Sequence, residues 1–236
     1  MECQIMPKDH AEAMAALRSQ MRGELIEPSH PNYDATRVIW NGMIDRKPAL
    51  IARCLNAGDV ALAVCFARDT SLAIAIRGGG HNVAGYAVCD GGLMIDLSLM
   101  KGVRVAPDLC SAFVEGGAIW GDVDAATTVF GRATPGGLIS DTGVAGLTLS
   151  GGIGWLRGSH GLSCDNLIAA DVVTSEGKLV HASENENVDL LCALRGGGGN
   201  FGVVVNFQFK LHAIEPELMF CAPTYPEERA DRKSVV

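Results

Sequence analysis

The stretch Arg77-Gly78-Gly79-Gly80-His81 decides the fold, because it closes the apolar run Leu72-Ala73-Ile74-Ala75-Ile76. Such a run is typical of a buried strand. Three adjacent glycines lose more conformational entropy on folding than any other residues, so at a strand end they indicate positive φ angles or close approach of a ligand to the backbone. We therefore predict that this strand carries bare backbone and one imidazole into a binding site.

Glycine clusters recur along the chain, which favours the ligand interpretation. The sequence has 29 glycines, and many of them fall at 78–80, 136–137, 151–154 and 196–202. Backbone N–H groups that converge in a turn can hold a phosphate without cations. The clusters therefore predict a ligand held mostly by amides.

Length and charge exclude several classes of protein. The chain has 236 residues, enough for one large domain or two small lobes, and 48% hydrophobic with 19% charged residues is typical of a globular protein. A net charge of -8 and a pI near 5.2 argue against a nucleic-acid partner, which needs a basic surface.

The sequence also gives no sign of export, membrane insertion or a metal site. No basic leader precedes an apolar segment, and no stretch approaches the ~18 apolar residues of a membrane span, so we expect a cytoplasmic protein without membrane contact. Eight irregularly spaced cysteines lack a zinc-type pattern. Free thiols are therefore favoured over disulfides.

The periodicity predicts two lobes after a lead-in helix and loop over residues 1–35. The first lobe spans about 36–101 and has β-α-β punctuation, with an apolar segment near 49–53, a helix over 60–68 capped by Asp59, and strands over 72–76 and 92–97. A helix over 11–22 belongs to the lead-in.

The second lobe, about 102–215, is richer in strands. A hairpin is expected over 103–115, helices over 119–130 and 187–194, and strands over 167–174, 178–181 and 202–211. Residues 216–236 carry no periodicity and are expected to form a tail at the start of a further domain. The fold class predicted is α+β, with a small β-α-β lobe and a larger lobe built on a mainly antiparallel sheet with flanking helices.

Common nucleotide and hydrolase motifs are excluded. Residues 197–202 match G-x-G-x-x-G, but a strand follows them where a dinucleotide fold needs a helix. No P-loop and no G-x-S-x-G elbow occur.

Seven motifs in order resemble the FAD-binding domain of the vanillyl-alcohol-oxidase (PCMH) type, in its berberine-bridge-enzyme-like branch. The resemblance spans about residues 25–215. Its motifs are R-G-G-G-H-N-V-A-G at 77–85, L-M-I-D-L at 93–97, V-E-G-G at 114–117, P-G-G at 135–137, T-G-V-A-G-L at 142–147 with S-G-G-I-G at 150–154, G-L-S-C-D-N at 161–166, and R-G-G-G-G-N-F-G at 195–202.

The resemblance implies a two-lobed fold that clamps an extended FAD against glycine-rich turns. His81 stands where relatives join a histidine covalently to the 8α-methyl of the flavin; the alternative is a turn histidine beside a non-covalent FAD. Relatives with a second, cysteinyl tether have it where this chain has Ile139, so one tether is expected. The implied cofactor contacts are Arg77, Gly78, Gly79, Gly80, His81, Asn82, Gly85, Ser140, Thr142, Gly143, Gly146, Gly151, Gly152, Asn166 and Val203.

Some arginine, asparagine and histidine side chains in these motifs and near them have an alternative interpretation. Arg77 and Arg195 either touch the cofactor or orient carbonyls and carboxylates in their turns. Asn166 either bonds FAD or serves a turn. His160, His181 and His212 lack metal spacing and are expected to be solvated.

By this resemblance the chain is an FAD-linked oxidoreductase domain. It would accept hydride from the carbon of an alcohol, sugar or amine, and molecular oxygen or another acceptor would reoxidise the flavin. Relatives take their catalytic base from a later C-terminal region, and nothing after Leu211 matches that region, so no catalytic base is assigned. The alternative is a non-catalytic, truncated FAD-binding module. The partner expected is a small-molecule substrate, and the oligomeric state is not predicted.

Overall fold

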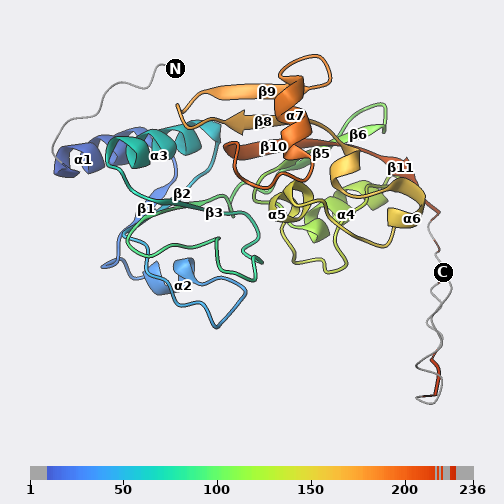
Figure 1. The fold of residues 1–236 in the computed structure, drawn as a ribbon, viewed down its shortest axis with the longest axis horizontal. Coiled ribbons are helices and arrows are strands. Elements are labelled where there is room, and N and C mark those ends of the chain that lie inside the picture. The colour runs from blue at the N-terminus through green and yellow to red at the C-terminus, as the bar shows by residue number, and fades with distance from the viewer. Residues whose placement is uncertain (1–9, 216, 218, 220–223, 227–236) are drawn as a thin grey trace.

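The computed structural model describes residues 10–215, 217, 219 and 224–226 (Figure 1). Most of the predicted tail, and residues 1–9 of the lead-in, lie outside them. The described part contains a four-stranded sheet, a five-stranded sheet and a two-stranded sheet, with helices packed around them.

The first sheet has the order β1-β2-β4-β3, formed by β1 (Glu24–Ile26), β2 (Leu50–Arg53), β4 (Leu93–Asp96) and β3 (Ile74–Arg77). Strand β4 is parallel to both β2 and β3, and β1 is antiparallel to β2. The chain crosses from β2 to β3 through α3 (Ala57–Asp69), as the β-α-β pattern predicts. Residues 24–26, assigned to the lead-in from the sequence, are an edge strand of this sheet.

Successive side chains of each strand point to opposite faces of the first sheet, and both faces are apolar. Leu93 and Ile95 face a core shared with α3 and α1 (His10–Gln20), whereas Met94 and Ile51 pack with Tyr33 of α2 (Tyr33–Arg37). In Figure 1, α1 and α3 lie side by side along one face of the sheet, and α2 lies beyond the other.

Helix α3 begins earlier than predicted. Asn56 is its N-cap, because the Asn56 side chain accepts a hydrogen bond from the Asp59 amide at 3.1 Å. Asp59 is buried and accepts from the amides of Arg22, Gly23 and Leu55 at 2.9–3.0 Å. The aspartate therefore ties the start of β1 to the end of β2, and the predicted cap at Asp59 is corrected.

The second sheet is antiparallel throughout, with the order β5-β6-β10-β8-β9. Its strands are β5 (Val103–Val105), β6 (Ser111–Glu115), β10 (Val203–Lys210), β8 (Leu167–Val173) and β9 (Leu179–Ser183). The helices of this half are α4 (Trp120–Thr128), α5 (Val144–Leu149), α6 (Arg157–His160) and α7 (Val188–Leu194), with a 3-10 turn at Cys164–Asn166. Strands β7 (Arg132–Ala133) and β11 (His212–Ala213) form the two-stranded sheet.

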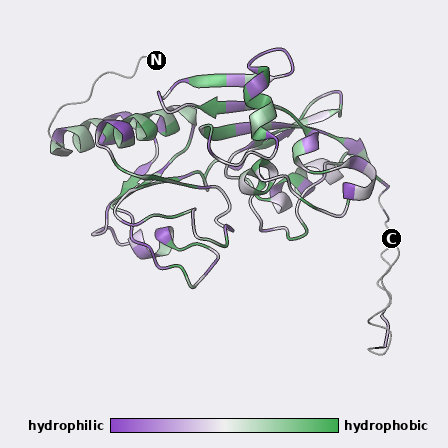
Figure 2. Cartoon of the chain, in the orientation of Figure 1, coloured by the Kyte–Doolittle hydropathy of each residue, from purple (hydrophilic) through white to green (hydrophobic). Residues whose placement is uncertain are grey.

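One hydrophobic core joins the two halves, and a second lies within the second half. The first is shared, since Phe66 of α3 packs in one cluster with Leu93 of the first sheet and with Val173 and Val203 of the second. The second core surrounds Trp120, Phe207 and Phe209. Figure 2 shows hydrophobic residues along β8 and β10, the strands at the centre of the second sheet. Burial of this extent joins the two sheets into one body.

Membrane spans and disulfides can be checked on the same part of the chain. Among the described residues, no helix combines the length and the apolar character that crossing a bilayer requires. Five cysteines are free, at positions 54, 89, 110, 164 and 192, as predicted. Cys65 is disulfide-bonded, which corrects the prediction for that residue.

Candidate cofactor site

The turn after β3 presents a row of free backbone amides. Strand β3 ends at Arg77, and the N–H groups of residues 78–82 donate to no acceptor within the described part of the chain. Gly80 has φ +75°, a conformation that favours glycine. Partly buried amides need a partner, and successive amides in a turn form a concave site for anionic or carbonyl oxygens. This turn is therefore a candidate ligand site built from backbone.

The same turn packs directly against the second half of the chain. A Cβ on Gly79 would lie 2.4 Å from both Cα and N of Gly143, and a Cβ on Gly143 would lie 2.4 Å from N of Gly79. A Cβ on Gly78 would lie 2.9 Å from the carbonyl oxygen of Gly116. Only glycine allows this approach, so these residues bring the 78–82 turn against the loop before α5.

A cavity of about 280 Å³ opens beside the turn. Gly78, Gly79 and Gly80 form one wall, and Trp40 and Lys101 lie among the other lining residues. This volume lies just below the roughly 300–1,000 Å³ of ordinary ligand pockets, so the cavity has room for only part of a large cofactor. Lys101 adds a cation to the free amides, which suits a negatively charged group.

His81 is held at the edge of this site by two residues. Its ring stacks on Trp40 with centroids 5.3 Å apart and planes inclined by 24°. Its Nε2 lies 3.6 Å from Oδ2 of Asp141, and the histidine side chain is 19% exposed. Sequence reasoning missed both neighbours. Trp40 is a lone aromatic in a loop, and Asp141 lies within the 135–143 segment without a motif position of its own.

Arg77 is committed to protein groups. Its Nε and Nη2 donate to the two carboxylate oxygens of Asp96 at 3.0 and 2.6 Å, and its Nη1 donates to the carbonyls of Thr36 and Val38. Burial raises the pKa of Asp96, but the bonds from Arg77 and Ser98 outweigh burial and leave that pKa below its usual value. The geometry favours the second interpretation of Arg77, that of orienting the turn.

Arg195 is likewise bound to the protein itself. Its Nε and Nη2 both donate to the carbonyl of Leu167, at 3.0 and 2.7 Å. The guanidinium therefore fixes the 195–202 glycine run to the start of β8.

Asn82 and Gly85 complete the first turn. The Asn82 side chain accepts from the amide of Tyr86 at 3.0 Å, and the Gly85 amide donates to the Asn82 carbonyl. Gly85 has φ +79°, and a Cβ there would meet Ile44 at 2.8 Å. Both residues shape the loop that carries His81.

The loop with Ser140, Thr142 and Gly143 lies next to the first turn. The carbonyls of Ser140 and Thr142 accept from Gly121 and Trp120 at 2.7 and 3.0 Å, which fixes the loop to the start of α4. A Cβ added at Gly146 of α5 would meet no atom within 4 Å, so this face of the helix is open. The predicted residues at 78–81 and 140–143 are therefore brought together.

Gly151 and Gly152 lie at the other end of α5. Both have positive φ, +106° and +84°, and their carbonyls accept from the amides of Cys164 and Ser163. A Cβ on Gly152 would meet Leu147 and Ser163 at 2.4–2.5 Å. Protein packing alone requires glycine at 152, which the ligand interpretation of that cluster had not considered.

Asn166 belongs to a polar cluster around two histidines. Its Nδ2 donates to the carbonyls of His160 and Leu162 at 2.9 and 2.8 Å, and its Oδ1 lies 2.6 Å from Nε2 of His212. The rings of His160 and His212 stack with centroids 3.8 Å apart. This arrangement favours the turn interpretation of Asn166.

The expectation of solvated histidines is corrected at His160 and His212, which are partly buried, whereas the side chain of His181 is 45% exposed, as expected. His160 and His212 stack on each other, and Nδ1 of His181 lies 2.7 Å from the Asp171 carboxylate. Burial, and then the charges of His160 and Lys210, lower the pKa of His212.

Val203 lies in the core between the sheets. It is 3% exposed, pairs with Val173 and packs in the cluster shared with α3. It is not among the residues that line the cavity beside the glycine turn. Among the described residues, no group of three or more histidine, cysteine or acidic side chains could hold a metal ion.

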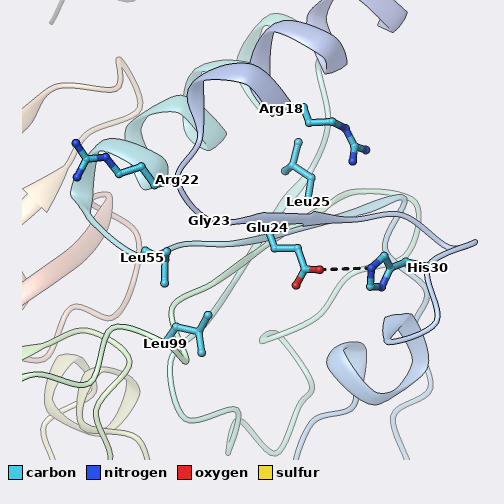
Figure 3. Close-up of a pocket in the computed structure, with 8 residues that line it drawn as sticks. All are labelled: Arg18, Arg22, Gly23, Glu24, Leu25, His30, Leu55 and Leu99. Atoms are coloured by element: carbon cyan, nitrogen blue, oxygen red, sulfur yellow. Dashed lines mark ion pairs between the residues drawn. The ribbon is translucent and has the colours of Figure 1, made fainter.

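A larger cavity, of about 390 Å³, lies elsewhere on the first sheet (Figure 3). It is lined by Arg18, Arg22, Gly23, Glu24, Leu25, His30, Leu55 and Leu99. Its charges are partly neutralised, since Arg18 pairs with Glu27 and His30 with Glu24. Its lining residues include no row of free amides and none of the predicted contacts, so the smaller cavity is the stronger candidate for the cofactor site.

Comparison with known proteins shows the family to which this geometry belongs. The family described as FAD binding domain matches residues 48–183, more than half of the chain. The chain belongs to this FAD-binding domain family. The matched range includes the 78–82 turn, His81 and the 140–143 loop.

Related proteins agree with this family. (R)-6-hydroxynicotine oxidase of Paenarthrobacter nicotinovorans is 40% identical over 199 residues, which cover 84% of this chain and 43% of that protein. The BBE-like 1 protein of Physcomitrella patens superposes with a TM-score of 0.81 at 28% identity, over 85% of this chain and 44% of that one.

Glucooligosaccharide oxidase of Acremonium strictum superposes with a TM-score of 0.80 at 36% identity, over 85% of this chain and 42% of that one. Its structure is described as having a 6-S-cysteinyl, 8α-N1-histidyl FAD. The chain thus spans less than half the length of these relatives. The comparisons confirm the predicted fold, the predicted family of FAD-linked oxidoreductases and FAD as the cofactor.

The residues of the site fit FAD. The free amides of 78–82 and the ammonium of Lys101 suit the phosphates or the ring carbonyls, and the Gly79–Gly143 contact leaves no side chain between the two loops. The imidazole of His81 stands beside this backbone at the stack with Trp40.

Proposed function

We propose that this chain is the FAD-binding part of an oxidoreductase in which the flavin is attached covalently to His81. The single observation that carries the proposal is the turn over 78–82, where five amides have no acceptor among the described residues and the partly buried imidazole of His81 lies beside a cavity. The histidyl FAD of glucooligosaccharide oxidase supports the attachment, because that protein shares this fold.

The formation of the covalent bond between His81 and the flavin is an oxidation, and its atoms and electrons balance with molecular oxygen as the oxidant. One N–H bond of the His81 imidazole and one C–H bond of the flavin 8α-methyl break, and one N–C bond forms. The two hydrogens, with two electrons, leave on oxygen as hydrogen peroxide. A histidyl link prevents loss of the cofactor and makes the flavin a better electron acceptor.

When bound, FAD supplies hydride acceptance from a carbon of a small-molecule substrate. We propose an alcohol, sugar or amine as the substrate class, because relatives of this fold are named as oxidases of 6-hydroxynicotine and of glucooligosaccharide. Oxygen is the proposed electron acceptor, for the same reason. This chain's residues would position and retain the flavin, with Trp40 and Asp141 flanking His81.

The attachment is tested by acid precipitation of the purified protein. We expect the wild-type precipitate to stay yellow and the His81→Ala precipitate to be colourless. The matched control is His181→Ala, since His181 lies on β9 and pairs with Asp171 outside the site. A colourless wild-type precipitate, or a yellow one from His81→Ala, would refute the attachment. Anaerobic bleaching by an amine or sugar substrate then separates an oxidoreductase from a module that only binds FAD.

A further inference from the structure

Asp141 projects from a loop whose backbone is fixed on both sides. The carbonyl of Ser140 accepts from Gly121 and that of Thr142 accepts from Trp120, and the Thr142 amide donates to Ile139. Trp120 is 1% exposed and anchors the second core. The position of the Asp141 Cα is therefore set by the core, although its side chain is 63% exposed.

The carboxylate of Asp141 has one partner within the described residues, and it is His81. The two side chains approach to 3.6 Å between Oδ2 and Nε2. Asp141 does not cap the helix that follows, because α5 starts after Gly143 without a side-chain cap. Asp141 therefore caps no helix, and among the described residues its carboxylate pairs only with the imidazole of His81. This pairing indicates a role for Asp141 in the cofactor site.

The contacts of His81 involve one face of its ring and Nε2, and they leave Nδ1 available. Trp40 covers one face of the ring, and Asp141 lies at Nε2. No partner for Nδ1 occurs among the described residues. In a neutral imidazole, the group that accepts from one nitrogen fixes the proton there and leaves the lone pair on the other.

We propose that Asp141 is the positioning residue that prepares His81 for bonding to the flavin. Its carboxylate, 3.6 Å from Nε2, favours the ring proton on that nitrogen by its charge and keeps the lone pair on Nδ1, the nitrogen that forms the bond. As Nδ1 bonds to the 8α-carbon, the ring gains positive charge, and the Nε2 proton leaves toward the Asp141 carboxylate. This inference rests on the proposed covalent attachment.

The expected effect is on the rate of attachment and not on affinity. Groups that hold or accept a proton in a reaction contribute ~100-fold to ~10,000-fold. Because Asp141 is exposed and its contact is long, we expect the low end, so Asp141→Ala should slow attachment by about 100-fold. The dissociation constant for non-covalent FAD should change less than about twofold, since the amides of 78–82 are untouched.

The experiment follows acid-stable flavin over time after cofactor-free full-length chain is mixed with saturating FAD. Fluorescence quenching gives the dissociation constant in parallel. The variants are Asp141→Ala, Asp141→Asn and Asp141→Glu. The matched control is Glu184→Gln, because Glu184 is exposed and this substitution removes one negative charge away from His81. Slow attachment in the Ala and Asn variants, recovery in the Glu variant and an unchanged control would support the proposal.

Three results would overturn it in distinguishable ways. Attachment by Asp141→Ala at the wild-type rate overturns the role of Asp141 and leaves the attachment to His81 intact. A wild-type chain that binds FAD and never forms acid-stable flavin overturns the proposed attachment and this inference with it. A loss of affinity that accounts for the slower rate would make Asp141 a binding residue and also overturn the proposal.

Discussion

Replacing Gly79 with alanine tests the contact that joins the two halves of the site. The new Cβ would lie 2.4 Å from two backbone atoms of Gly143, about 1 Å closer than ordinary van der Waals contact. Neither loop can yield by rotating a side chain, because the clashing atoms are backbone. Gly79 does not have a positive φ, so the penalty is steric.

The magnitude follows from the cost of overpacking. Inserting a methylene into a packed site costs about 1–3 kcal/mol, and a backbone-to-backbone clash belongs at the upper end. For a chain of this size, about 3 kcal/mol corresponds to a fall in Tm of about 6–12 °C. The same shift would separate the 78–82 turn from the 140–143 loop, so affinity for FAD should fall as well.

The assay is thermal unfolding of the cofactor-free chain, followed by FAD titration. Gly158→Ala is the matched control, because a Cβ at Gly158 meets nothing within 4 Å and the residue lies in α6. Alanine in a helix stabilises by up to about 1 kcal/mol relative to glycine, so the control should not lower Tm. Equal Tm values for Gly79→Ala and the wild type would refute the contact.

Two further predictions concern charge. Asp96→Asn removes a fully buried anion and leaves Arg77, whose side chain is 12% exposed, without its charge partner, so we expect a loss of about 3–5 kcal/mol in the free energy of unfolding. Denaturant titration measures this loss, with Asp189→Asn as the control because Asp189 is exposed. Equal free energies of unfolding for the two variants would contradict the prediction. The native pKa of His212 is lowered from 6.5, so the unfolded chain binds more protons and stability should fall as pH drops below about 6.5. His212→Gln should flatten that dependence in unfolding measured from pH 5 to 8, and an unchanged slope would refute the assignment.

The elements with strong periodicity or motif signals could be predicted from the sequence. The apolar run 72–76 predicted the strand β3, which begins at Ile74 because the amides of residues 70–72 bond back to the last turn of α3. The prediction that this strand is buried is wrong, since β3 lies at the edge of its sheet and Ile74 is 40% exposed. The alternation over 202–211 predicted the strand β10, although it indicated a half-exposed strand and β10 is largely buried at the centre of its sheet. These signals are local, and local sequence suffices to read them.

Contacts between distant residues account for what the sequence did not reveal. Asp59 resembles an N-cap, yet it binds the amides of Arg22 and Gly23 from a distant segment, and Asn56 is the N-cap of the helix. His212 meets Asn166 across 46 positions. Trp40 and Asp141 reach His81 from separate loops, so only the folded chain brings them together.

Amide-resolved NMR during FAD titration tests the central claim most directly, because the claim concerns the backbone N–H groups of residues 78–82. We predict that these five amide resonances, with that of Gly143, show the largest shifts and gain protection from exchange. Unchanged resonances at 78–82, with shifts confined to Arg22, Leu55 and Leu99 around the larger cavity, would contradict the account.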